Sequence, residues 1–515
     1  MNVFDWLKKK ILNFLGIEHL SYNPTGERMT FISDDEAIRR YKVRECKVWY
    51  CADDSEILNF YTNERLYGLN SNPIYNRNKK QYFWAQASVE SDIKRVHSGL
   101  AHAIVTTLVN VIGNHRASSP APAVNDAIAA KTEKNNLAAI VNQEEMPLTL
   151  AEGQGCFKYT FDTSVDDAPI IEFYDAENVQ FIYKRKRLVG VVFTDYYKDK
   201  KGNDYVLFET RRIQDGDSLI EFKLFRIKGN DLKEAKLSDL PETDGLPEEG
   251  YRIPGLNEVM ATPTVFFYDP LNQGGGRSIF EGKIGLFDDL DLTLSQQSQT
   301  VKVSTPVEYY DSEAMGFTSN GLPKPPTAFN RQFIAKFPMR DGNGNTHSNA
   351  VETTQPRLDF NQYGIAARQI LSQILTGLMS EASMGIDLAR DDNALAQREK
   401  EKVTMMTRNN VIARQTHIIK DLYRKCLMLA EFMSTGAITI KDYQIDVKYD
   451  EFANPSFENE LPLLAQALAS GAISPEQYID RLYGDSLSEE QKQYELAYVK
   501  EFMAAQAAQM GGDVL

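Results

Sequence analysis

Two amphipathic helical patterns, separated by a stretch rich in proline and glycine, constrain this chain more than any other feature of its sequence. Apolar residues recur at steps of three and four in both, the period of a helix with one packed face: Phe280, Ile284, Phe287, Leu290 and Leu294 first, then Ile365, Ile370, Leu371, Ile374, Leu375 and Leu378. We expect these helices to leave one core and return to it antiparallel, side by side. Such a pair favours a ring subunit, in which neighbours complete each other's burial, over an enzyme with an enclosed pocket.

Length and charge narrow the class of protein. With 515 residues the chain exceeds the size of a single core, so more than one folded unit is expected. Its 42% hydrophobic and 25% charged residues are typical of globular domains. The net charge of -15 argues against a protein that grips DNA by neutralising many phosphates.

The cysteines and histidines give no metal-binding pattern. The spacing of the four cysteines is not that of zinc ligands, and reduced thiols fit assembly in the cytosol. His97 and His102 lie in a helical pattern, but no carboxylate or cysteine partner can be placed beside them. No metal and no cofactor is therefore expected. The cysteines are Cys46, Cys51, Cys156 and Cys426.

The N-terminal segment combines apolar residues with the lysines at positions 8–10. These lysines interrupt the apolar run, and no small-residue cleavage site follows, which argues against a signal peptide. An amphipathic helix on a membrane surface and a helix docked on protein both remain open. No later stretch approaches the ~20 apolar residues of a membrane span, so none is predicted.

The first half of the chain changes from helical to strand periodicity at Cys156. Before it, helical patterns cover residues 34–67, 89–111 and 126–143. After it, three β-rich runs are separated by turn residues that tolerate positive φ, which predicts an antiparallel meander. The runs are residues 188–197, 204–212 and 219–227, and residues 239–255 are predicted to form an exposed loop.

The second half is predicted to place a small α/β or β module between the two amphipathic helices. A loop with the sequence SMGID follows the second helix, and a long charged helix then runs to about Met433. The chain is therefore predicted to be α+β. Strand-like pieces are residues 307–310, 332–337 and 443–449, and helices near the end are residues 458–470, 475–483 and 488–509.

With these elements in place, the sequence resembles the portal proteins of tailed double-stranded-DNA phages, in particular those of long-tailed phages of Gram-positive hosts. The shared order of four stretches carries the resemblance, and it covers most of the chain. The stretches are Gly153–Lys158 with Tyr174–Val179, Ser278–Leu294 with Asp288-Asp289-Leu290-Asp291, Ser380–Asp387 with Arg398-Glu399-Lys400, and Gly471–Pro475 with Tyr478–Leu482.

The resemblance implies a portal fold with a wing, a two-helix stem, a clip, a tunnel loop and a helical crown. The wing would have a helical first part and the antiparallel meander after residue 156. The expected parts are the wing at 1–277, stem helices at 278–301 and 358–380, the clip at 302–357, the tunnel loop at 381–394, a long wing and tunnel helix at 395–434, and the crown at 435–515.

The same resemblance implies a function without catalysis. Twelve subunits would form a ring at one capsid vertex, in the virion, after assembly in the host cytoplasm. The ring would conduct double-stranded DNA during packaging and ejection without sequence specificity. Expected partners are the terminase large subunit, the major capsid and scaffolding proteins, and a head-tail adaptor. An acidic wall would keep the DNA mobile, because each firm cationic contact with phosphate adds a barrier to sliding.

The resemblance also assigns residues to three sites. The loop facing the channel and its DNA would present Asp387, Arg390, Asp391, Asp392 and Asn393. The clip facing the terminase and the connector would present Tyr309, Tyr310, Lys324, Phe329 and Arg340. The stem would use Asp288, Asp289, Leu290, Leu294, Ile370 and Ile374.

Several motifs allow two interpretations. Residues 274–278 could cradle a phosphate at a helix N-terminus, or form a hinge with Ser278 as the helix cap. Asp288, Asp289 and Asp291 could be catalytic carboxylates, but a solvated or lumen-facing stripe is the plainer interpretation. The clip aromatic residues could anchor a partner or pack within their own module.

The long helix carries cations that could touch DNA phosphates, although they alternate with glutamates and ion pairs are the plainer account. They are Arg398, Lys400, Lys402, Arg408 and Arg414. Two alternatives to a portal subunit remain: a nucleic-acid-processing enzyme with an unrecognised site, and a capsid or tail protein that forms no channel.

Overall fold

The computed structural model mixes helices and strands, which confirms the α+β class. The chain divides into two compact units: unit 1 comprises Met1–Leu388 and Lys400–Asp450, and unit 2 comprises Ala389–Glu399 and Glu451–Leu515. The structure describes residues 34–62, 82–86, 93–160, 168–228, 231–270, 274–304, 307–311, 319–321, 332–336, 351–354, 360–386, 394–449, 457–483 and 489–510.

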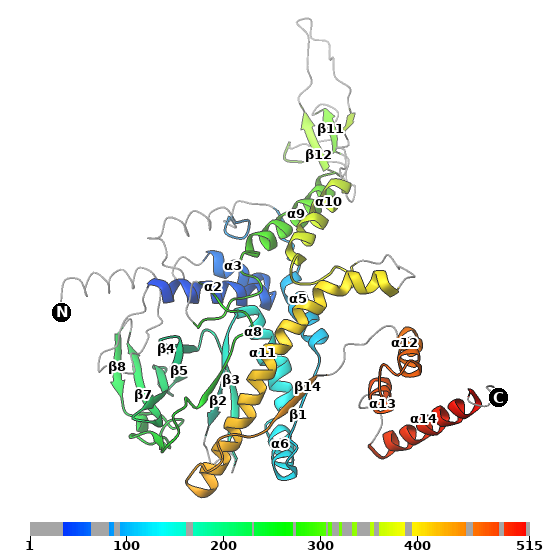
Figure 1. Cartoon of the computed structure of the whole chain (residues 1–515). Helices are drawn as coiled ribbons and strands as arrows, with labels where there is room; N and C mark the ends of the chain where they lie inside the picture. Colours follow the sequence, from blue (N-terminus) through cyan, green and yellow to red (C-terminus); the bar gives the residue numbers. More distant parts are fainter. Residues whose placement is uncertain are drawn as a thin grey trace, which may run out of the picture. The chain divides into compact units, whose positions relative to one another are not determined.

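The described part of unit 1 begins with helices, as the sequence predicts (Figure 1). The helix predicted over residues 89–111 starts only at Leu100, because Gly99 before it adopts a left-handed conformation with φ 62°. The helices are α2 (Asp34–Cys51), α3 (Asp54–Thr62), α5 (Leu100–Ile112), α6 (Pro122–Lys134), α7 (Leu137–Ala139), the π-helix η2 (Ile140–Glu145) and α8 (Met146–Glu152).

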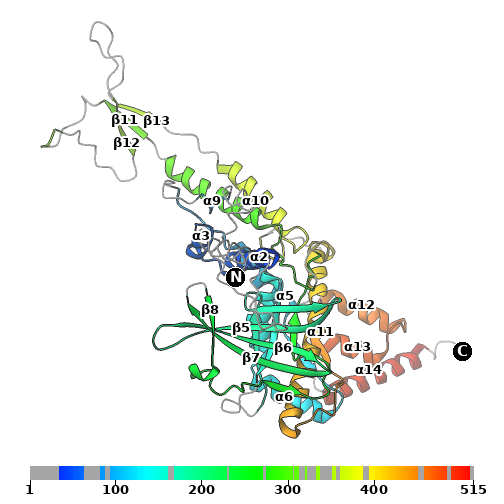
Figure 2. The same ribbon diagram turned by 90° about the vertical axis from the view of Figure 1, so that its left-hand side faces the viewer.

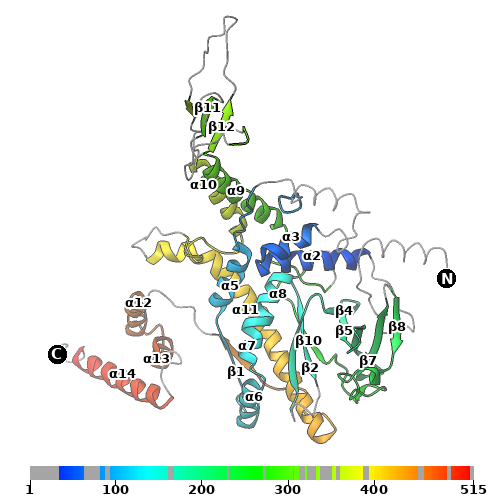
Figure 3. The same cartoon turned by 180° about the vertical axis from the view of Figure 1, so that it is seen from behind.

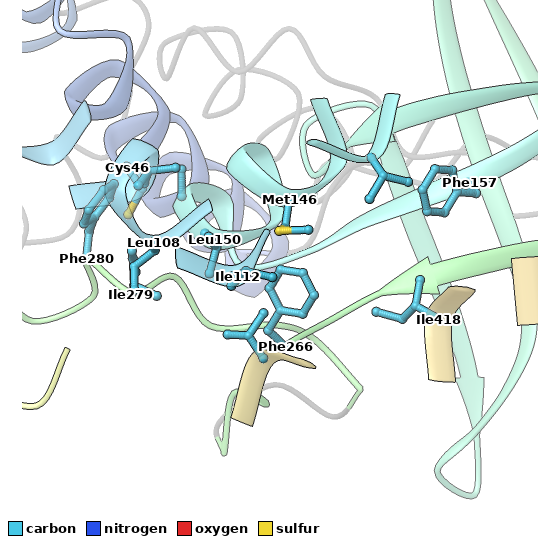
Figure 4. Packing of buried hydrophobic residues seen from close by; sticks show 14 of the residues in the cluster. Cys46, Leu108, Ile112, Met146, Leu150, Phe157, Phe266, Ile279, Phe280 and Ile418 are labelled. Carbon is cyan, nitrogen blue, oxygen red and sulfur yellow. The ribbon is translucent and has the colours of Figure 1, made fainter. Parts of the chain in front are cut away.

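One large apolar core joins these helices to later parts of the chain. Leu108 and Ile112 of α5 are fully buried in it, together with Phe280 from the segment before the first stem helix. Figure 4 shows side chains of this core from six regions of unit 1: Cys46 of α2, Leu108 and Ile112 of α5, Met146 and Leu150 of α8, Phe157, Phe266 with Ile279 and Phe280, and Ile418.

A three-stranded antiparallel sheet, in the order β10-β2-β3, separates two regions of unit 1. Side chains alternate between the faces of a strand, and Phe157 of β2 packs in the helical core whereas Cys156 packs against the next sheet. Figures 1 and 3 show α11 and the larger sheet on opposite sides of β2. The strands are β2 (Gly155–Thr160), β3 (Ile170–Asp175) and β10 (Ala261–Thr264).

The larger sheet confirms the predicted antiparallel meander (Figure 2). Gly202 and Gly216 adopt positive φ in the turns, as the sequence predicts. The loop predicted over residues 239–255 is not wholly exposed, since it contains a further strand and the fully buried Thr243. The strands are β4 (Val179–Lys184), β5 (Arg187–Lys198), β6 (Asp204–Gln214), β7 (Asp217–Lys228), β8 (Asp231–Ala235) and β9 (Tyr251–Ile253), and η3 spans Leu237–Asp239.

The glycine-rich segment before the first stem helix packs backbone to backbone against the end of α8. A Cβ atom on Gly276 would lie 1.8 Å from the carbonyl oxygen of Gly153. Ser278 does not cap the stem helix, because α9 begins only at Ile284. Its hydroxyl donates to the Ala151 carbonyl oxygen and accepts from the Phe280 amide. The segment therefore fastens α8 to the start of α9.

Replacing Gly276 with alanine is expected to lower the free energy of unfolding by about 2 kcal/mol or more, because the new methyl group forces two backbones apart. Denaturant unfolding of the full chain measures the change. Gly245→Ala is the matched control, since a Cβ at Gly245 meets nothing within 4 Å. An equal decrease in the free energy of unfolding of the two variants would contradict the close packing of Gly276.

The two amphipathic helices that are predicted to form a stem run antiparallel, as the sequence predicts (Figure 1). The Lys283 amine at the start of α9 donates to the Thr376 carbonyl just beyond α10, at 3.0 Å. At the other end, the Thr300 hydroxyl donates to the Tyr363 hydroxyl. A three-stranded sheet, in the order β12-β11-β13, is inserted between the helices. The elements are α9 (Ile284–Val303), α10 (Phe360–Leu375), β11 (Val307–Asp311), β12 (Gln332–Lys336) and β13 (Val351–Thr354).

The long charged helix is α11 (Ala394–Thr435), and its later half packs in the large core. After it, β14 (Asp446–Tyr449) pairs antiparallel with β1 (His115–Ser118). Among the helices that the structure describes, none is both long and apolar enough to cross a membrane. Unit 2 contains α12 (Phe457–Ala469), α13 (Pro475–Tyr483) and α14 (Glu489–Met510).

Candidate functional site

Two carboxylates attach the first turns of α9 to the rest of unit 1. Asp288 accepts hydrogen bonds from the backbone amides of Phe83 (2.7 Å) and Trp84 (3.1 Å). Asp291 accepts from the Trp84 indole at 3.0 Å and from the Ser98 amide at 2.9 Å. Both aspartates are buried, so the expected solvated or lumen-facing stripe is wrong for them. Only Asp289 between them is exposed.

Burial gives these aspartates a structural role. Burial raises the pKa of Asp288 to about 6, although the two amide donors oppose that shift by stabilising the carboxylate. His97 lies in the extended segment before α5, not in a helix, and its Nδ1 is 2.7 Å from an Asp291 carboxylate oxygen. Within the described ranges, no group of three potential ligands could hold a metal ion.

Farther along, α9 and α10 leave apolar side chains uncovered. Val301 of α9 is 48% exposed, and Phe360 and Ile365 of α10 are 49% and 59% exposed. Nearer the core, Leu290 and Ile374 are buried, while Leu294 and Ile370 are half-buried. The helix pair therefore has exposed apolar side chains that become buried when another helix packs against them.

The structure describes only some of the residues predicted for the clip and tunnel sites. Tyr309 lies in β11 opposite Ile334 of β12, and its side chain is half-buried. Tyr310 follows it in the same strand. The remaining predicted residues lie outside the described residues: Lys324, Phe329 and Arg340 of the clip, and Asp387, Arg390, Asp391, Asp392 and Asn393 of the tunnel loop.

One cation of α11, for which the sequence left both phosphate contact and ion pairing open, caps another helix. Arg408 is buried, and its guanidinium donates to the carbonyl oxygens of Val111 (2.8 Å) and Ile112 (3.4 Å) at the end of α5. A cation at a helix C-terminus satisfies carbonyls that have no partner within the helix and interacts favourably with the helix dipole. Arg408 is therefore not available to DNA.

A second residue of α11, Gln415, binds the buried acid Glu145. Glu145 of the π-helix accepts a hydrogen bond from the Gln415 side-chain amide at 2.7 Å, and both side chains are fully buried. Burial raises the pKa of Glu145 to about 8, while the hydrogen bond from Gln415 opposes the shift. A protonated Glu145 can return a hydrogen bond to the Gln415 carbonyl oxygen, which otherwise has no partner within the described part of the chain. Glu145 is therefore a neutral acid at pH 7.

A groove of about 790 Å³ lies where the segment before α9, the end of α10 and the middle of α11 meet. It combines an exposed aromatic ring with cations, because the Arg414 guanidinium lies 4.9 Å from the centre of the Tyr268 ring. No sequence pattern indicates this groove, since its walls come from distant segments. Its polar and aromatic lining includes Tyr268, Arg277, Lys283, Asn410, Arg414 and His417.

The chain matches no known protein-family model, and it has no significant match among curated proteins.

Proposed function

We propose that this chain is a portal subunit, a structural protein that forms a ring-shaped channel at one capsid vertex. The antiparallel pair of α9 and α10 carries the proposal, because a sheet is inserted between the two helices in the sequence and Phe360 and Ile365 of the pair are exposed. Exposed apolar side chains on a helix pair are satisfied when neighbouring copies pack side by side. The portal resemblance of the sequence supports the same arrangement.

In this proposal, α9 and α10 are the stem, the sheet of β11, β12 and β13 is the clip, and α12–α14 are the crown. The ring conducts double-stranded DNA during packaging and ejection. The clip binds the terminase large subunit and later a head-tail adaptor, and the remaining partners are the capsid and scaffolding proteins. The subunit catalyses no reaction and requires no cofactor.

Ring formation by the purified full chain tests the proposal. We expect negative-stain micrographs to show closed rings with a central hole, and native mass spectrometry to give one subunit number near twelve. Monomers with nuclease or ATPase activity would instead support the enzyme alternative. Assemblies without a central hole would support a capsid or tail protein that forms no channel.

A charge on the exposed stem surface is expected to prevent ring closure. Ile365→Glu should raise the protein concentration at half-assembly by about a hundredfold, because each contact between neighbours would bury an unpaired carboxylate. Ile440→Glu is the matched control, since Ile440 is 48% exposed but lies outside the stem. Analytical ultracentrifugation measures both variants. Rings of normal stability in Ile365→Glu would contradict the role of the stem.

A further inference from the structure

One side of α11 is left uncovered by the described parts of unit 1. Val403 and Met406 are 40% and 58% exposed, and Asn410, Arg414 and His417 are also exposed. Their spacing of three and four residues places them on a single helix face. The face is apolar at its first end and cationic at its second, where it forms one wall of the groove beside Tyr268.

The charge of this groove is not neutralised by the residues around it. Arg414 forms no ion pair with another described residue, and its contact is the exposed Tyr268 ring. Glu281 is the carboxylate of the groove wall, but it already binds Lys42 at 3.2 Å and Arg277 at 3.3 Å. The groove therefore presents a cation beside an aromatic ring in a protein whose net charge is -15.

The loop between β8 and β9 has the opposite character. Residues 237–250 contain five carboxylates and no lysine or arginine. None of Glu242, Asp244, Glu248 and Glu249 forms an ion pair with another residue in the described ranges, and all four side chains are exposed. The loop is an uncompensated acidic surface.

The acidic loop is held rigidly. Leu237 and Leu240 are buried against the meander, and the buried Thr243 hydroxyl donates to the Leu237 carbonyl oxygen at 2.5 Å. Gly250 closes the loop with φ 71°, where a Cβ would lie 2.1 Å from the Ile220 carbonyl oxygen. A rigid loop loses little conformational entropy when it binds a partner.

The two surfaces cannot meet within the same copy of unit 1. The meander that carries the acidic loop and the helix α11 lie on opposite sides of the β2 sheet (Figures 1 and 3). Two complementary surfaces on different sides of one protein make a heterologous contact, which generates closed rings when its rotation closes. The partner that fits the groove is therefore another copy of the same chain.

We propose that the groove beside α11 receives the acidic 237–250 loop of a neighbouring copy. Arg414 and His417 meet the carboxylates of the loop, and Val403 and Met406 become buried at the rim. This inference rests on the proposed ring and names the surfaces that join its subunits. Double-stranded DNA suits the groove less well, because phosphates would leave the apolar end of the α11 face uncovered.

Two charge-reversed variants of the full chain test this contact. The first carries Arg414→Glu and His417→Glu, so that groove and loop are both acidic. The second carries lysine in place of all four exposed carboxylates, so that the loop becomes basic like the groove: Glu242→Lys, Asp244→Lys, Glu248→Lys and Glu249→Lys. Alone, each variant should need at least a tenfold higher concentration for half-assembly, because like charges face each other at every contact. Mixed in equal amounts, they should assemble at close to the wild-type concentration, since each groove then finds a complementary loop.

Matched controls separate this contact from general charge effects and from misfolding. Lys184→Glu and Glu133→Lys change exposed charges elsewhere in unit 1, and they should leave assembly unchanged. Thermal unfolding checks that all variants remain folded. Fluorescence anisotropy with a labelled DNA duplex forms a further arm, and loss of DNA binding by the groove variant together with normal assembly would overturn the proposal in favour of DNA.

The outcomes distinguish this contact from the proposed function. Wild-type rings with normal assembly of both variants would overturn the groove contact and leave the portal proposal standing. Failure of the mixture to assemble would also overturn the contact. Wild-type chains that associate through the groove and loop without closing a ring would support the contact and contradict the portal. A wild-type protein that stays monomeric at all concentrations would contradict both the groove contact and the portal proposal.

Discussion

Replacing Glu145 with glutamine is expected to raise the free energy of unfolding by on the order of 3 kcal/mol at pH 7. The wild-type protein must keep this buried acid protonated, with a pKa of about 8, whereas an unfolded glutamate ionises near 4.5. Glutamine is neutral at every pH, and its amide can donate to the Gln415 carbonyl oxygen while accepting the bond that Gln415 already donates. Both side chains then have reciprocal hydrogen bonds without a proton to retain.

The effect should depend on pH in a defined direction. Between pH 4.5 and 8 the folded wild-type protein holds a proton that the unfolded chain has lost, so its stability falls as pH rises. The difference in the free energy of unfolding between Glu145→Gln and the wild type should therefore be small near pH 4.5, grow across this window and level off above pH 8. Denaturant unfolding at several pH values, followed by tryptophan fluorescence, measures it.

Glu144→Gln is the control for this prediction, because Glu144 is the exposed neighbour of Glu145 in the same π-helix. It should change the free energy of unfolding by less than about 0.5 kcal/mol at every pH. A pH-independent difference between Glu145→Gln and the wild type would contradict a buried neutral acid at this position.

Replacing Asp291 with alanine is expected to lower the free energy of unfolding by about 3 kcal/mol or more. The substitution leaves the Trp84 indole and the Ser98 amide without their acceptor, and it removes the contact with His97. The segment around Trp84 should detach from α9, so the fluorescence of the buried Trp84 should shift to longer wavelength. Urea unfolding and emission spectra measure the two effects.

Asp289→Ala provides the comparison for Asp291. It removes a carboxylate from the same turn of α9, but Asp289 is exposed and should contribute less than about 0.5 kcal/mol. An equal loss in the free energy of unfolding of the two variants would contradict the attachment of α9 through the buried hydrogen bonds of Asp291.

The sequence predicted those helices, strands and turns that are determined by the pattern of neighbouring residues. The meander follows from alternating apolar residues and from turns at Gly202 and Gly216, where positive φ suits glycine. The antiparallel pair of α9 and α10 follows from apolar spacing and from the breakers between them. Each strand, turn and helix among these is determined by residues that are close together in sequence.

Distant contacts account for what the sequence did not predict. The run of aspartates in α9 has the pattern of an exposed face, yet Asp288 is buried because it accepts a hydrogen bond from Phe83, 205 residues away. Arg408 resembles a surface cation, yet it caps α5 across 297 residues. The late start of α9 has the same origin, because the segment before it packs on α8. Such partners become neighbours only through the tertiary fold.

The continuous α11 helix links contacts that would otherwise be independent. Arg408 binds the end of α5, Gln415 binds the π-helix, and Lys425 donates to the Ala261 carbonyl oxygen of β10 at 2.6 Å. A rigid helix cannot turn about its axis at one of these points alone. Any torque applied to this part of α11 must therefore strain all three attachments together, which makes residues 408–425 of the helix a single mechanical element.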